Sequence, residues 1–255
     1  SHPELLDWLA NDFMRNGWKL KRLHKLIMTS QAYQQVSFRN KNQDAIDPDN
    51  RLLGRMNIRR MEAETIRDAV LSLSGNINLK LHGKPIPVTE NDEGQVIIGV
   101  NTTDSANRPT GKQVDMEGEQ YRRSIYVQVR RSLQLSFLDA FDAPTMEPNC
   151  AKRPVSTVAP QALIFMNNAF VLDQSRAMAE KLAALAKDDL DTQLTMGWEH
   201  TFGYPATPEQ LSQSREFVHR QTALFKERGD KSPQLTALAS YCQALMSSNR
   251  FVYVY

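Results

Sequence analysis

Proline placed in the first turn of amphipathic segments constrains this chain most strongly, because it favours a helical fold. A serine or threonine followed closely by proline opens four segments: SHPE (1–4), STVAP (156–160), TPEQ (207–210) and SPQ (232–234). The hydroxyl can accept a hydrogen bond from a free amide, and proline is tolerated where the first-turn amide lacks a helical partner. These signals and the apolar periodicity predict helices over about 160–186, 208–228 and 233–247.

The N-terminal part shows the same helical periodicity. A helix is predicted to begin at residue 1 and to stop at Gly17, and a second to begin at about Lys19, with Leu20 and Met28 facing inward. A third is predicted over about 61–74 and closed by Gly75, because glycine readily adopts the left-handed conformation that ends helices.

The region from 76 to 131 has a different texture, rich in glycine and in β-branched residues. PIPV (85–88) and QVIIGV (95–100) favour short strands, and RRSIYVQVRR (122–131) alternates with period two, which predicts a strand. Residues 101–120, between QVIIGV and RRSIYVQVRR, are predicted to form a long exposed loop. Loops of this length are usually functional or disordered. Residues 137–143 suggest a short helical turn, and FVYVY (251–255) a short strand or docked tail.

The predicted fold class is therefore mainly α (α+β): a multi-helix domain with a small β-element inserted around residues 85–131. The 255 residues are expected to form one domain. Because the sequence starts directly on a helix cap, it is expected to begin within a longer protein. No apolar stretch reaches the length of a membrane span.

Composition argues against several function classes. The formal net charge of +2 is far below that of a dedicated nucleic-acid binder. The five histidines show no metal-binding spacing, so no metal site is predicted, and no CxxCH motif for covalent haem is present. Cys150 and Cys242 are expected to be structural thiols or, in an oxidising compartment, a disulfide.

The stretch RMNIRRMEAETIRDAV (55–70) holds the charged residues best suited to form ion pairs or to bind a ligand. On one interpretation, Arg60, Glu64, Arg67 and Asp68 form an internal ion network along a helix, because residues three and four apart share a face. On the other, arginines converge to bind a carboxylate, sulfate or phosphate. The anion site would then consist of Arg59, Arg60, Arg122 and Arg123.

Paired carboxylates give a weaker signal for hydrolytic chemistry. Glu62 and Glu64 are expected on different sides of one helix, and Asp139 and Asp142 have no evident partner acid. A hydrolase of this kind needs two acids across a cleft. No catalytic residue can be assigned from this pattern.

Several long motifs in order carry a family resemblance. They are SHPELLDWLA, GWKLKRLHKLIMTSQAYQQ, DPDNRLLGRMNIRRMEAETIRDAVLSLSG, YRRSIYVQVRRS and RPVSTVAPQALIFMNNAFV. Together they resemble the Planctomycete-specific domain of unknown function found at the C-terminus of large, exported, cytochrome-c-associated proteins.

In that family the domain begins further upstream, so the resemblance implies a fragment that lacks its N-terminal helices. It also implies an extracytoplasmic (periplasmic or secreted) module whose partners are other domains of the same polypeptide. Covalent haem would lie on a separate domain, with no cofactor in this segment. The module would act as a scaffold or binding module, with an anionic or polysaccharide ligand. The alternative is part of a hydrolase or redox enzyme whose active site is shared with upstream domains.

Overall fold

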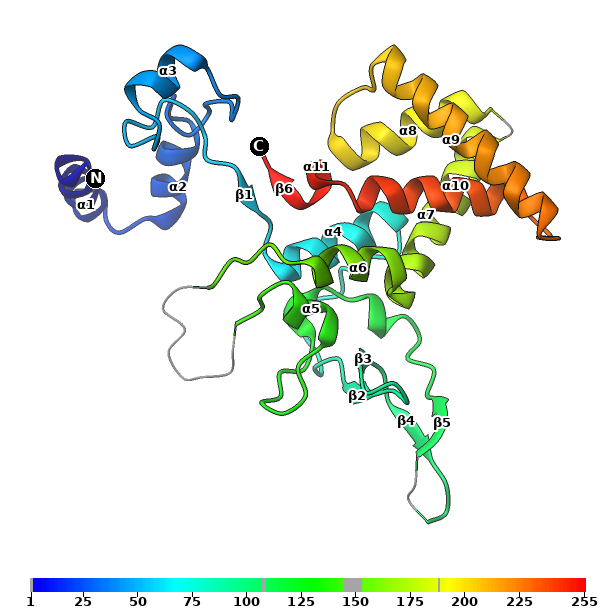
Figure 1. The fold of residues 1–255 in the computed structure, drawn as a ribbon. Helices are drawn as coiled ribbons and strands as arrows, with labels where there is room; N and C mark the ends of the chain where they lie inside the picture. Colours follow the sequence, from blue (N-terminus) through cyan, green and yellow to red (C-terminus); the bar gives the residue numbers. More distant parts are fainter. Residues whose placement is uncertain (1, 107–108, 145–152, 188) are drawn as a thin grey trace. The chain divides into compact units, whose positions relative to one another are not determined.

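The computed structural model describes residues 2–106, 109–144, 153–187 and 189–255. By its internal contacts the chain divides into two compact units, residues 1–59 with 253–255 and residues 60–252. The fold is mainly helical with small two-stranded sheets, which confirms the predicted fold class (Figure 1). No helix among the described residues is long and apolar enough to cross a membrane.

The smaller unit contains three helices: α1 (Pro3–Arg15), α2 (Leu20–Met28) and α3 (Lys41–Ile46). The first two were predicted, and α3 was not. Leu20 and Met28 are exposed rather than inward-facing, and none of the described residues of α1 and α2 is buried. Three short helices of this size do not enclose a core of their own.

The larger unit is built mainly from helices. They are α4 (Ala63–Ser74), α5 (Ser136–Ala140), α6 (Ala159–Asn167), α7 (Ala169–Ala186), α8 (Leu190–Phe202), α9 (Pro208–Glu227), α10 (Pro233–Met246) and α11 (Asn249–Val252). The predicted segments 61–74, 208–228 and 233–247 are thus confirmed, whereas α8 was not foreseen. The turn predicted over 137–143 is seen as α5.

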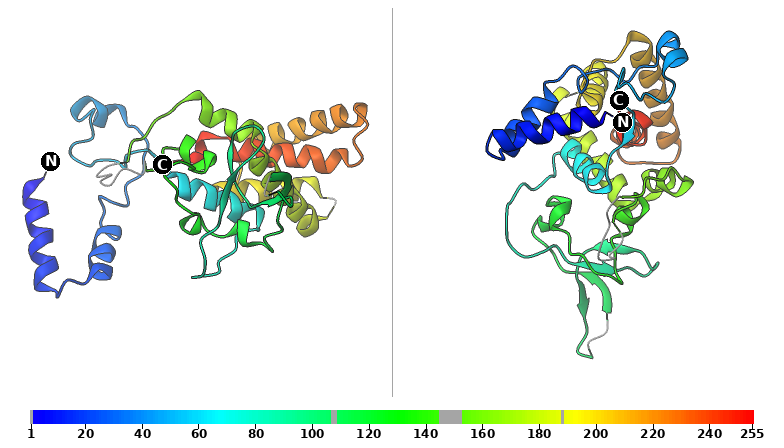
Figure 2. Two further views of the ribbon diagram at one scale, coloured as in Figure 1. Left: turned by 90° about the horizontal axis from the view of Figure 1, so that it is seen from below. Right: turned by 90° about the vertical axis from the view of Figure 1, so that its left-hand side faces the viewer.

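The core of this unit lies where α7 packs against α10 and α4. Val171, Met178 and Leu182 of α7 are fully buried, as are Ile66 and Val70 of α4. Helices α9 and α10 lie side by side, as Figures 1 and 2 show, and bury Val218 and Leu238. A buried aliphatic side chain contributes about 1.5–3 kcal/mol relative to an exposed one, so this layer is the main source of stability.

The prediction of one long helix over 160–186 is wrong in one respect. The structure has two helices there, α6 and α7, which meet at Asn168. This residue has an extended backbone, ends α6 and caps α7, and its side-chain oxygen accepts a hydrogen bond from the Phe170 amide at 3.0 Å. Asparagine is among the strongest N-cap residues because its short side chain reaches these free amides.

Among the described residues, the β-structure consists of two antiparallel hairpins and two further short strands. Strand β2 (Val88–Glu90) pairs with β3 (Val96–Ile98), and β4 (Asn101–Thr103) pairs with β5 (Pro109–Gln113). The latter hairpin occupies much of the region predicted as a loop over 101–120, and it projects away from the helices in Figures 1 and 2. The remaining strands are β1 (Arg59–Arg60) and β6 (Tyr253–Val254).

The strand predicted over 122–131 is wrong. Its residues form a 3₁₀ turn over Ser124–Tyr126, preceded by another over Glu119–Tyr121, and Val127 makes one isolated bridge to Ile86. Of the three apolar residues in the alternating pattern, Val127 is 7% exposed but Ile125 and Val129 are 74% and 67% exposed. The period-two pattern therefore has no buried face to support it.

Candidate functional site

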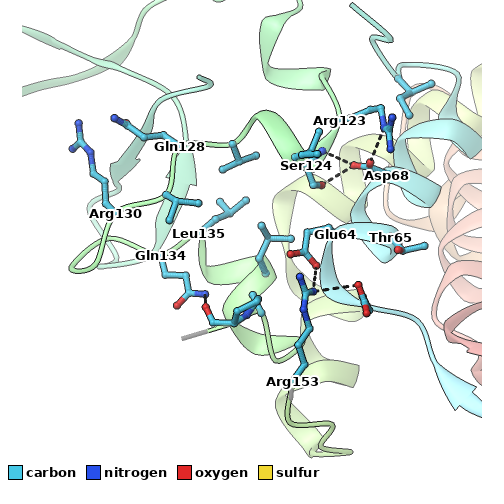
Figure 3. Close-up of a pocket in the computed structure, with 18 residues that line it drawn as sticks. Glu64, Thr65, Asp68, Arg123, Ser124, Gln128, Arg130, Gln134, Leu135 and Arg153 are labelled. Carbon is cyan, nitrogen blue, oxygen red and sulfur yellow. Dashed lines mark hydrogen bonds and ion pairs between the residues drawn. The ribbon is translucent and has the colours of Figure 1, made fainter. Parts of the chain in front are cut away.

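Helix α4 and the segment 123–130 form two walls of an open pocket of about 590 Å³ in the larger unit (Figure 3). The helix starts after Glu62, whose extended backbone precedes the first turn, and ends at Gly75 with φ of 84°. Glycine adopts this left-handed conformation without steric cost. The pocket is lined on this side by Glu62, which precedes the helix, and by Glu64, Thr65 and Asp68 of α4.

Apolar side chains line part of this pocket and charged ones the rest. Leu135 and Leu138 are buried, while Ile125 and Val129 are exposed. The ionisable side chains that line the pocket are three acids and three bases: Glu62, Glu64, Asp68, Arg123, Arg130 and Arg153.

Every acid of the pocket is engaged by an arginine. Arg153 Nη1 lies 2.7 Å from Glu64 Oε2 and 3.3 Å from Glu62 Oε2. The two glutamates were expected on different sides of the helix, but one guanidinium nitrogen reaches both. The two glutamates share Arg153, whose single positive charge offsets one of their two negative charges.

Asp68 anchors the opposite wall. Its Oδ1 accepts hydrogen bonds from both the amide and the hydroxyl of Ser124, each at 2.7 Å, and its Oδ2 lies 3.5 Å from Arg123 Nε. These bonds pin the 3₁₀ turn onto α4 across 56 residues of sequence. Asp68 is thus a positioning residue for the segment that forms the wall.

Two polar side chains of the pocket differ from the others. Arg130 and Gln128 make no side-chain hydrogen bond or ion pair with the described residues. In Figure 3 both side chains extend away from the Glu64–Arg153 and Asp68–Arg123 pairs. Neither is among the four residues predicted for the anion site.

Arg60, one of the four predicted anion-site residues, lies outside the helix and in the protein interior. Its guanidinium is 3% exposed and donates to the carbonyl oxygens of Ser156 and Phe141 at 2.8 and 2.9 Å and to Asp142 Oδ2 at 2.7 Å. The predicted pair with Glu64 is not formed. Arg60 instead ties three segments of the chain together.

Arg122 is also buried, with 1% of its side chain exposed. It donates to the carbonyl oxygens of His82 and Lys84 and to Glu119 Oε2, and its guanidinium lies 4.0 Å from the Tyr126 ring centroid. It shares no hydrogen-bond partner with Arg60, so these two residues do not form one cluster. Of the other two predicted residues, Arg123 is paired with Asp68, and Arg59 is exposed in the smaller unit.

Arg67 completes the set of structural arginines. It donates to the carbonyl oxygens of Arg122 and Gln120 at 3.0 and 2.7 Å and to Ser124 Oγ at 3.2 Å. Burial lowers the pKa of Arg67 to about 10, so it remains charged at neutral pH. The charge is satisfied mainly by backbone carbonyls, and Asp68 lies 3.9 Å away.

The described residues contain no group of three or more histidine, cysteine or acidic side chains arranged to hold a metal ion. Cys242 is fully buried, and burial raises the pKa of its thiol to about 12. This is the chemistry of an unreactive structural cysteine. Cys150 lies outside the described residues.

The fold and the pocket define a mainly helical protein in which the buried arginines are structural, and in which Arg130 of the pocket has no partner among the described residues. The chain belongs to the PSD1 family, described as protein of unknown function (DUF1553), whose family model matches residues 1–218. A search of the curated proteins found no match. A search of the solved structures also found none.

Proposed function

We propose that this chain is a binding module, and that the pocket beside α4 receives an anionic group of its ligand at Arg130 and Gln128. The main support is that Arg130 lines the pocket without a partner among the described residues, whereas Arg123 and Arg153 are paired with acids. A guanidinium binds carboxylate, sulfate or phosphate with two parallel hydrogen bonds.

The local charge distribution supports an anion rather than a cation. Glu62 and Glu64 lie against Arg153, and Asp68 lies against Arg123 and Ser124, so each acid of the pocket already has a donor. The Arg130 side chain extends away from both of these pairs (Figure 3). Gln128 can add an amide donor beside it.

The setting of the module is part of the same proposal. The resemblance in sequence supports an extracytoplasmic protein with further domains on the same polypeptide, one of them carrying covalent haem. Those domains would be its partners, and the anionic ligand would be an acidic polysaccharide. The low net charge of +2 disfavours nucleic acid as the ligand.

The test is equilibrium binding of dextran sulfate and polygalacturonate to the chain at increasing salt. Binding should be saturable and should weaken as salt screens the exposed guanidinium. Arg130→Gln should weaken it about tenfold, which corresponds to about 1.4 kcal/mol. Arg131→Gln is the matched control, because it removes the same charge from the neighbouring exposed residue that does not line the pocket. Equal losses in the two variants, or no saturable binding, would contradict the proposal.

A further inference from the structure

A second cavity, of about 610 Å³, lies in the larger unit where the α6–α7 break faces the β2–β3 hairpin. It is lined by residues of α4, β3, β5, α5 and the first turns of α7. Seven of its 19 lining residues are asparagine or glutamine. Because amides both donate and accept hydrogen bonds, such a lining suits a ligand that does the same.

Gln174 is the most informative residue of this cavity. It is 2% exposed, and its Oε1 accepts hydrogen bonds from Ser74 Oγ at 2.8 Å and Asn76 Nδ2 at 2.9 Å. These two donors fix the orientation of the amide and leave its Nε2 hydrogens without a partner among the described residues. Gln174 Nε2 is not among the covered unpaired polar atoms of the described residues, so its hydrogens are accessible to a ligand in the cavity.

Further uncommitted polar groups surround the same space. Gln120 has a covered side-chain oxygen with no hydrogen-bond partner among the described residues. Asn167 and Asp173 line the cavity from either side of the Asn168 break, and both are exposed with no side-chain bond to the described residues. The cavity therefore offers donors from amides and acceptors from an amide and a carboxylate.

Charge decides which ligand class fits. The ionisable residues of the lining are Arg67, Glu93 and Asp173, and the Arg67 charge is already satisfied by the carbonyl oxygens of Arg122 and Gln120. The uncompensated charge is negative, which repels phosphate, sulfate and carboxylate. Phe170 and Tyr121 add half-buried aromatic surface on which the C–H face of a sugar ring can pack.

We propose that this cavity binds a neutral carbohydrate, with hydroxyl groups donating to Asp173 and accepting from the Gln174 amide. The site is distinct from the Arg130 pocket in charge. It also explains why the α6–α7 segment breaks at Asn168: the break ends one helix at Asn167 and places Asp173 and Gln174 in the first turns of the next.

The test is calorimetric titration of the full chain with neutral cello-, xylo- and malto-tetraose. We expect saturable binding of at least one of them, weakened about tenfold by Asp173→Ala and by Asn167→Ala. Glu180→Ala is the matched control, because it removes an exposed acid from the same helix outside the cavity. Gln174→Glu keeps the acceptor for Ser74 and Asn76 but removes the amide donors, and it should weaken binding as well.

Thermal unfolding of each variant separates lost binding from lost folding, and Asp173→Ala and Asn167→Ala alter exposed residues only. The Arg130→Gln variant should bind the neutral tetrasaccharides with unchanged affinity, so this site and the anion pocket can fail independently. Absence of saturable binding by all three, or binding that the cavity variants do not weaken, would overturn the proposal. Preference for an amide-rich peptide over the tetrasaccharides would overturn it as well.

Discussion

Arg60 Nη2 and Asp142 Oδ2 lie 2.7 Å apart although 82 residues separate them in the sequence. Asp142 also accepts from the Ser156 amide at 2.7 Å and from the Ser156 hydroxyl at 2.8 Å. The pair therefore joins β1, the turn that follows α5 and the segment before α6. Arg60 therefore acts as an internal connector, a buried side chain that joins separate segments of the chain.

Removing the charge of Asp142 should destabilise the protein. Asp142→Asn leaves the buried Arg60 guanidinium without its counter-ion, and a hydrogen bond to a charged group contributes about 1.5–3 kcal/mol. We expect a loss of about 2 kcal/mol in the free energy of unfolding, measured by urea denaturation. Asp139→Asn, which changes an exposed acid on the same turn, should cost little; equal effects would contradict the connector role.

The same carboxyl should contribute to the acid limit of stability. Burial raises the pKa of Asp142, but the hydrogen bonds from Ser156 and Arg60 outweigh it, so the pKa lies below its ordinary value. For a carboxyl with a depressed folded-state pKa, the stabilisation is complete above the unfolded value of about 3.9 and disappears as the pH falls through the folded value. Unfolding free energies between pH 6 and 3 should therefore fall less steeply for Asp142→Asn than for the wild type, and parallel curves would exclude this contribution.

Arg67 should be sensitive to a change that keeps its charge. Arg67→Lys retains a cation but lacks the planar fork that reaches two carbonyl oxygens and Ser124 Oγ at once. Leaving a buried acceptor unpaired costs about 1–3 kcal/mol, and we expect a loss within that range. The exposed Arg123→Lys is the control, and its unfolding midpoint should stay close to that of the wild type.

The cap at Asn168 should stabilise the start of α7. Asn168→Ala removes the acceptor of the Phe170 amide and should cost about 1 kcal/mol. Asn167→Ala changes the preceding exposed asparagine, which makes no such bond among the described residues, and should be close to neutral. If the two substitutions have the same effect on thermal unfolding, the break at Asn168 is not maintained by capping.

The helices could be predicted because their signals are local. The proline-marked starts of α9 and α10 and the glycine end of α4 depend on residues within one turn, so sequence spacing is sufficient. The failure at 122–131 has the opposite cause: Arg122 and Ser124 are drawn inward by partners from other segments, which overrides the alternating pattern.

The arginines show the same limit at the level of the site. Spacing along a helix suggested pairs three and four residues apart, but Arg60 bonds to residues 81 to 96 positions away and Glu64 bonds to Arg153, 89 positions away. Partners this distant leave no periodic trace in one sequence. The fold is therefore needed to separate structural arginines, such as Arg60 and Arg122, from Arg130, which we propose binds a ligand.

The most direct test of the account observes individual arginines by NMR. The side-chain Nε–H resonance of Arg130 should shift progressively and saturate when a sulfated disaccharide is added, while those of the buried Arg60 and Arg122 should not move. Gln128 side-chain amide signals should shift with the same titration midpoint. If Arg130 stays unperturbed, or if Arg131 and the other exposed arginines shift in parallel with it, the pocket beside α4 is not an anion-binding site.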